Sequence, residues 1–142
     1  MQMKSLLILA VGLAVVLSAC GARGTGAGDD AATDPKTATI TAEALRQRLQ
    51  SDEVKPLVVD VREPHEFTQG HIEGARLAPL GRVIEDLGGV EKDREIVLVC
   101  RSGNRSGKAQ KLLAERGYTS LANMDGGMLA WEKQGYPVVT QP

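Results

Sequence analysis

Residues 95–106 read Glu-Ile-Val-Leu-Val-Cys-Arg-Ser-Gly-Asn-Arg-Ser, so a continuously apolar run passes directly into a small polar loop. The run is rich in β-branched residues and lacks polar alternation, which is typical of a strand buried on both faces of a parallel sheet. Residues 106–116 then follow a helical pattern, and Gly117 stands just past the end, where helices commonly stop. This stretch therefore predicts a strand, a tight loop and a helix in succession.

The segments around it continue the alternation of strand and helix. Pro79 has no backbone N–H to donate to a neighbouring strand, which favours an edge position for the strand at residues 75–80. Thr41 is an N-cap candidate for the first helix. Together they predict an open α/β sheet with helices on both faces, in which ligands bind beyond the carboxyl ends of the strands. The predicted strands are 56–61, 75–80, 95–100 and 119–124, and the predicted helices are 42–49, 106–116 and 128–133.

The loop at residues 100–106 places one thiol among groups that stabilise negative charge. Cys100 ends the strand, Arg101 and Arg105 supply two guanidiniums, and Gly103 permits the positive φ that such a bend can require. Backbone N–H groups and the start of the next helix add partial positive charge. These features lower a thiol pKa and favour a bound anion, so we predict a reactive thiolate rather than an inert buried cysteine.

Four segments of the chain read Asp-Val-Arg-Glu-Pro-His-Glu-Phe at 60–67, Gly-His-Ile-Glu-Gly-Ala at 70–75, Cys-Arg-Ser-Gly-Asn-Arg at 100–105 and Gly-Gly-Met-Leu-Ala-Trp at 126–131. Together they resemble the single-domain rhodanese (sulfurtransferase) family. The resemblance implies an open, parallel, five-stranded sheet with helices on both faces. It also implies that Cys100 takes a sulfane sulfur from a small anionic donor such as thiosulfate, forming a persulfide, and passes it to a thiol or a sulfur-carrier protein.

The resemblance also implies roles for individual residues. Asp60 and Arg62 would fix the loops from the neighbouring strand end, as a structural ion pair rather than as catalytic groups. His71 is interpreted as structural and Trp131 as part of the core. No metal and no organic cofactor is implied. The residues expected to bind the donor and the persulfide are Arg101, Ser102, Gly103, Asn104 and Arg105.

Two other functions share parts of this pattern. Cysteine phosphatases use a similar anion loop with five residues between Cys and Arg, whereas four residues separate Cys100 from Arg105. The second alternative is a non-catalytic module that only carries sulfur or binds a partner, although inactive members usually lack the loop cysteine. Nucleic-acid binding is not supported, because 17 Lys and Arg against 18 Asp and Glu give a net charge of −1.

The N-terminal residues are predicted to be a targeting signal rather than part of the fold. Lys4 precedes an apolar run at residues 6–17, which is shorter than the roughly 20 residues of a spanning helix. Residues 17–20 read Leu-Ser-Ala-Cys and resemble the lipobox of bacterial lipoproteins. That resemblance implies cleavage before Cys20 and its acylation with chains such as palmitate.

These signals divide the chain into three parts. Residues 1–19 are expected to be the lipoprotein signal peptide, and residues 20–38 the lipidated cysteine and a flexible tether, since residues 21–38 contain no large apolar side chain. Residues 39–142 are expected to be the rhodanese domain. The mature protein is then expected to be anchored by lipid to a membrane of the bacterial cell envelope, with its domain outside the cytoplasm.

Overall fold

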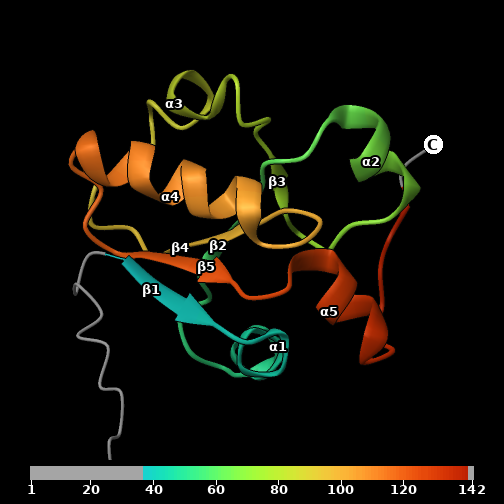
Figure 1. The fold of residues 1–142 in the computed structure, drawn as a ribbon. Coiled ribbons are helices and arrows are strands. Elements are labelled where there is room, and N and C mark those ends of the chain that lie inside the picture. The colour runs from blue at the N-terminus through green and yellow to red at the C-terminus, as the bar shows by residue number, and fades with distance from the viewer. Residues whose placement is uncertain (1–36, 141–142) are drawn as a thin grey trace, which may run out of the picture.

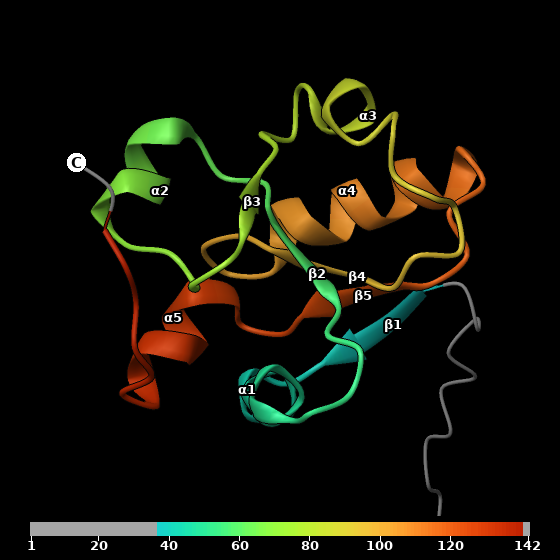
Figure 2. The ribbon, with the colours of Figure 1, turned by 180° about the vertical axis from the view of Figure 1, so that it is seen from behind.

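Five parallel strands form a single sheet in the order β1-β5-β4-β2-β3 (Figures 1 and 2). The computed structural model describes residues 37–140. The strands are β1 (Thr37–Ile40), β2 (Leu57–Asp60), β3 (Arg76–Leu77), β4 (Ile96–Val99) and β5 (Leu121–Met124). The helices are α1 (Ala42–Gln50), α2 (Pro64–Gln69), α3 (Val83–Asp86), α4 (Asn104–Glu115) and α5 (Gly127–Lys133).

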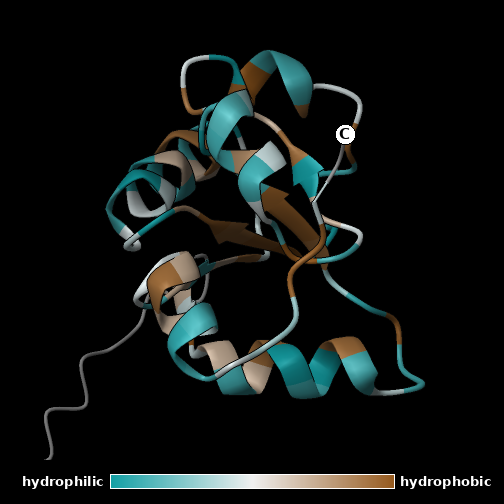
Figure 3. Cartoon of the chain, turned by 90° about the vertical axis from the view of Figure 1, so that its right-hand side faces the viewer, coloured by the Kyte–Doolittle hydropathy of each residue, from teal (hydrophilic) through white to brown (hydrophobic). Residues whose placement is uncertain are grey.

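Strand β4 lies at the centre of the sheet and separates two apolar layers. Its four side chains are all buried, and they alternate between the two faces as the strand period requires. Ile96 and Leu98 pack in the layer beneath α3 and α4, whereas Val97 and Val99 pack in the layer formed with α1 and α5. Figure 3 shows these central strands as the most hydrophobic part of the chain, between helices with mixed surfaces. The predicted α/β sheet with helices on both faces is confirmed.

Most of the predicted elements are present. Helix α1 begins behind Thr41, whose hydroxyl accepts a hydrogen bond from the N–H of Ala44 at 3.1 Å. Strand β3 lies at the sheet edge, as Pro79 predicted. Helix α4 starts at Asn104, two residues earlier than predicted. Within residues 37–140, no helix is long and apolar enough to span a bilayer.

Strand β1 was not predicted, and it corrects the boundary of the tether. Residues 37 and 38 were expected in the flexible segment, but β1 starts at Thr37 and pairs with β5 along the sheet edge. Strands pair through their backbones, which any sequence can supply. Because Ile40 is the single large apolar residue of β1, the sequence has little hydrophobic pattern by which to predict this strand. The expected signal peptide, the lipidated Cys20 and the tether up to residue 36 lie outside the described residues.

Helices α2 and α3 were also not predicted. Helix α2 is short, and local contacts define its start: Pro64 occupies the first turn, and the Glu66 carboxylate accepts a hydrogen bond from the N–H of Glu63 at 3.1 Å. A Pro at the first position followed by Glu at the third is a recognisable start signal. Helix α3 is a single turn whose burial depends on Val83, so no helical periodicity can develop.

Candidate active site

The loop after β4 lies at the carboxyl end of the sheet, with β2 and β5 on either side. Cys100 directly follows the strand, and α4 begins four residues later at Asn104. Gly103 makes this sharp bend possible by adopting a φ of +93°, in the left-handed region where other residues are strained. The loop therefore occupies the position at which the sequence predicted a ligand site.

The Cys100 sulfur accepts two hydrogen bonds from the start of α4. The N–H of Gly103 lies 3.1 Å from Sγ, and the hydroxyl of Ser106 lies 3.2 Å from it. Burial of Cys100 raises its pKa, but the Ser106 hydroxyl and the N–H groups of Ser106, Ser102 and Gly103 outweigh that effect. The net result is a thiol pKa below its ordinary value, which favours the nucleophilic thiolate.

Ser106 contacts the candidate nucleophile, and the sequence analysis did not single it out. Its side chain is fully buried, in the first turn of α4, and its hydroxyl points back to the sulfur. Side chains in the first turn of a helix point back toward the loop that precedes it. A Ser shortly after the cysteine loop was therefore the sequence signal for a hydroxyl near the sulfur. The thiolate is thus held by a side chain as well as by the backbone.

The segment at residues 123–129 supports the loop from the other side. The N–H groups of Met128 and Leu129 donate to the carbonyls of Cys100 and Arg101, at 2.8 and 3.0 Å. The amide of Asn123 donates to the carbonyl of Gly103 at 3.1 Å. A Cβ on Gly127 would lie 2.3 Å from the Cys100 carbonyl oxygen, so only glycine allows this close approach.

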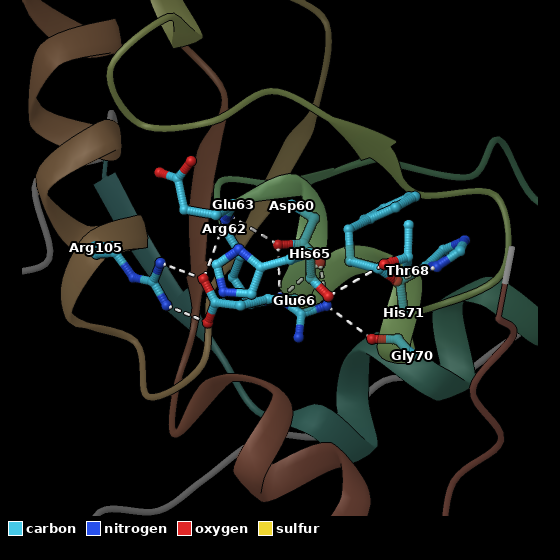
Figure 4. Close-up of polar contacts among 10 residues, drawn as sticks. Asp60, Arg62, Glu63, His65, Glu66, Thr68, Gly70, His71 and Arg105 are labelled. Atoms are coloured by element: carbon cyan, nitrogen blue, oxygen red, sulfur yellow. Dashed lines mark hydrogen bonds and ion pairs between the residues drawn. The ribbon is translucent and has the colours of Figure 1, made fainter. Parts of the chain in front are cut away.

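Asp60 and Arg62 form a buried ion pair beside the loop, as Figure 4 shows. Nη2 of Arg62 lies 2.6 Å from Oδ2 of Asp60, and it also donates to the carbonyl of Gly70 at 2.8 Å. His71 is buried and stacks on the ring of Phe67, and its Nδ1 lies 2.9 Å from the carbonyl oxygen of Phe67. These contacts link β2 to α2.

Arg105 is bound to a carboxylate that the sequence analysis did not single out. Both terminal nitrogens of Arg105 lie 2.7 Å from the carboxylate oxygens of Glu66, which reaches over from α2 (Figure 4). The hydrogen bond with Arg105 lowers the pKa of Glu66 to about 2, so Glu66 is ionised at neutral pH. The guanidinium expected to bind the donor is therefore already paired in the described structure.

A pocket of about 260 Å³ opens beside the loop. The side chain of Arg101 is exposed there, and its guanidinium makes no hydrogen bond or ion pair with another residue of the described part of the chain. Ser102 and Asn104 are also exposed. In residues 37–140, no three His, Cys, Asp or Glu side chains gather as metal ligands would. The pocket is lined by Arg62, Glu66, Gln69, Gly70, Arg101, Met128, Leu129 and Glu132.

The sequence of the chain matches the Rhodanese-like domain family over residues 41–134. A "Sulfurtransferase" of Allochromatium vinosum is 40% identical over 100 residues, which cover 70% of this chain and 92% of that protein. The "Thiosulfate sulfurtransferase GlpE" of Shewanella oneidensis is 33% identical over 91 residues, covering 63% of this chain and 90% of the relative. Other relatives are longer proteins, and the match covers 28% of one and 55% of another.

The fold has close counterparts among solved structures. The crystal structure of a rhodanese-like domain protein from Staphylococcus aureus superposes with a TM-score of 0.66 at 30% sequence identity. The superposition covers 74% of this chain and 99% of the other. The likeness thus extends over the whole of that domain.

Proposed function

Because this chain belongs to the rhodanese family and is a sulfurtransferase, we propose that it transfers sulfane sulfur from thiosulfate or a similar small anion to a thiophilic acceptor through a persulfide on Cys100. The observation that carries the proposal is the sulfur of Cys100, which accepts hydrogen bonds from Gly103 and Ser106 at the base of the loop. Such donors stabilise a thiolate before the reaction and a persulfide anion after it.

In the first step, the Cys100 thiolate attacks the outer sulfur of thiosulfate. A bond forms between Sγ and that sulfur, the sulfur–sulfur bond of thiosulfate breaks, and sulfite leaves with the electron pair. The charges balance, since a thiolate and a dianion become a persulfide anion and a dianion. Cys100 is only 1% exposed, which favours donors that present a terminal sulfur atom.

In the second step, an acceptor removes the outer sulfur. Cyanide would attack this atom and leave as thiocyanate, and a thiol or a sulfur-carrier protein would act in the same way. The bond to Sγ breaks, and the thiolate is regenerated. Until then the persulfide is held by the N–H groups of the loop and by the buried Ser106 hydroxyl.

Steady-state kinetics test this proposal. Thiosulfate and cyanide should give parallel double-reciprocal plots, because sulfite leaves before cyanide reacts. Intersecting plots would contradict a covalent intermediate. An aryl phosphate should not be hydrolysed; turnover of that compound in place of thiosulfate would assign the loop to phosphatase chemistry instead.

The place of action is a separate part of the proposal. The Leu-Ser-Ala-Cys pattern at residues 17–20, behind an apolar segment, supports a lipid anchor at Cys20 in the bacterial cell envelope. Two or more acyl chains hold a protein far more firmly than one, which binds only marginally. The tether up to residue 36 would then separate the domain from the bilayer.

Replacing the lipobox cysteine tests the anchor. Wild-type protein should partition into the detergent phase and carry acyl chains on Cys20, whereas Cys20→Ala should remain an uncleaved precursor without them. Mass spectrometry of the N-terminal peptide shows whether the chain has been cleaved before residue 20 and whether it carries acyl chains. A wild-type protein that starts elsewhere and carries no lipid would refute this part, without affecting the sulfurtransferase proposal.

A further inference from the structure

We infer that Glu66 is a specificity-determining residue: by neutralising Arg105 of the loop at residues 100–106, it makes the enzyme prefer a singly charged sulfur donor, a persulfide or thiosulfonate anion, over a dianion such as thiosulfate. The inference rests on the proposed function, since it concerns the donor of that reaction. It starts from the finding that the guanidinium expected to bind the donor is occupied by a carboxylate of the protein itself.

The charged side chains that line the pocket, taken with their ion-pair partners Asp60 and Arg105, sum to zero. Arg62 is paired with Asp60, and Arg105 is paired with Glu66. Arg101 is the one guanidinium of the pocket without a partner in the described part of the chain, and Glu132 also lines the pocket. The carboxylates Asp60, Glu66 and Glu132 thus match the guanidiniums Arg62, Arg101 and Arg105.

Arg105 directly precedes Ser106, whose hydroxyl lies 3.2 Å from the Cys100 sulfur, so the fold brings the ion pair to the loop that holds the nucleophile. Hydrogen bonding to Glu66 is the main cause that raises the pKa of Arg105, and the charge of Cys100 raises it further. With Arg105 neutralised, a donor approaching the Cys100 thiolate meets one guanidinium that no carboxylate of the described residues contacts directly, that of Arg101. A second negative charge on the donor then gains little attraction, while its repulsion from the thiolate and from Glu66 increases.

The pairing is held in place by α2. The Glu66 carboxylate accepts the N–H of Glu63 at the helix start, in addition to both nitrogens of Arg105. The Glu66 side chain is 18% exposed, so solvent screens the pair only in part. A donor therefore cannot bind Arg105 without displacing a carboxylate that the N–H of Glu63 also holds.

Two donors that differ mainly in charge give a direct test. Thiosulfate carries two negative charges, and methanethiosulfonate carries one, because a methyl group replaces an oxygen; both present a terminal sulfane sulfur. In Glu66→Gln, the ratio of kcat/KM for thiosulfate to that for methanethiosulfonate should rise about five- to tenfold at low ionic strength. Gln can still accept the N–H of Glu63, so α2 should form.

Two controls separate charge from structure. Glu66→Asp retains the negative charge while disturbing the geometry, so its donor ratio should stay near the wild-type value even where both rates fall. Glu115→Gln removes an exposed carboxylate at the far end of α4 and should leave the ratio unaltered. A structural role alone would lower the rates with both donors equally in Glu66→Gln, and that result would overturn the inference.

A second readout does not depend on sulfur transfer. Iodoacetate and iodoacetamide both alkylate a thiolate, but only the first is charged, so Glu66→Gln should raise the ratio of the iodoacetate rate to the iodoacetamide rate at Cys100. An unchanged alkylation ratio overturns the charge role of Glu66. If wild-type protein transfers sulfur from neither donor, the proposed function fails, and the alkylation ratio still decides the role of Glu66.

Discussion

Incubation of the protein with thiosulfate and no acceptor is expected to add one sulfur atom per chain, on Cys100, with release of one equivalent of sulfite. Apart from Cys20, which the lipid is proposed to occupy, Cys100 is the only cysteine in the sequence. No second thiol of the chain can then resolve the persulfide, so the sulfur must remain until an external acceptor arrives. Mass spectrometry of the intact protein and of its peptides measures the added sulfur and its position.

The matched variant is Cys100→Ser, which removes the soft nucleophile and changes little volume. Its rate of sulfur loading should fall by at least about a thousandfold. Its circular dichroism spectrum and unfolding midpoint should stay near those of the wild type. Cyanide should discharge the loaded wild-type protein. A Cys100→Ser protein that still turns over thiosulfate would contradict the mechanism.

The pH dependence of loading follows from the hydrogen bonds to the sulfur. Because these bonds lower the pKa of Cys100, loading should reach its full rate at a lower pH than an ordinary thiol would allow. Removing one donor in Ser106→Ala should shift the profile toward higher pH. A profile that does not move would show that the hydroxyl does not stabilise the thiolate.

Much of the fold could be predicted because the buried strands leave a clear apolar pattern in the sequence. β2 and β4 are short apolar runs, and their burial on both faces explains why they lack polar alternation. β1 was not predicted because its Thr and Ala residues give little hydrophobic signal. It is an edge strand that backbone hydrogen bonds hold to β5. α2 depends on capping at Glu63 and Glu66 rather than on an apolar face.

In the site, the sequence was informative about the nucleophile and less so about its surroundings. Cys100, Gly103 and the two arginines are close in the chain, so a local pattern reveals them. The partner of Arg105 is 39 residues away, and only the fold brings Glu66 to it. The same holds for the contacts of Asn123 and Met128 with the loop backbone, which join β5 and α5 to the end of β4.

Replacing Gly127 should have the largest effect on the fold of the site. The residue adopts a φ of +55°, and a Cβ would lie 2.3 Å from the carbonyl oxygen of Cys100 and 2.6 Å from the carbonyl carbon and oxygen of Arg101. These are backbone atoms, so neither can move aside without breaking the hydrogen bonds from Met128 and Leu129 to the same carbonyls. Gly127→Ala should therefore lower the free energy of unfolding by about 3–5 kcal/mol and abolish sulfur loading.

Gly135→Ala separates the contact with the loop from backbone strain. Gly135 has a φ of +69°, but a Cβ there would meet no atom within 4 Å, so its replacement should cost about 1–2 kcal/mol and leave loading intact. Urea unfolding of the two variants with equal m-values measures the difference directly. If Gly127→Ala proved no more destabilising than Gly135→Ala and still loaded sulfur at the wild-type rate, the close approach of α5 to the Cys100 backbone would not be what holds the loop in shape.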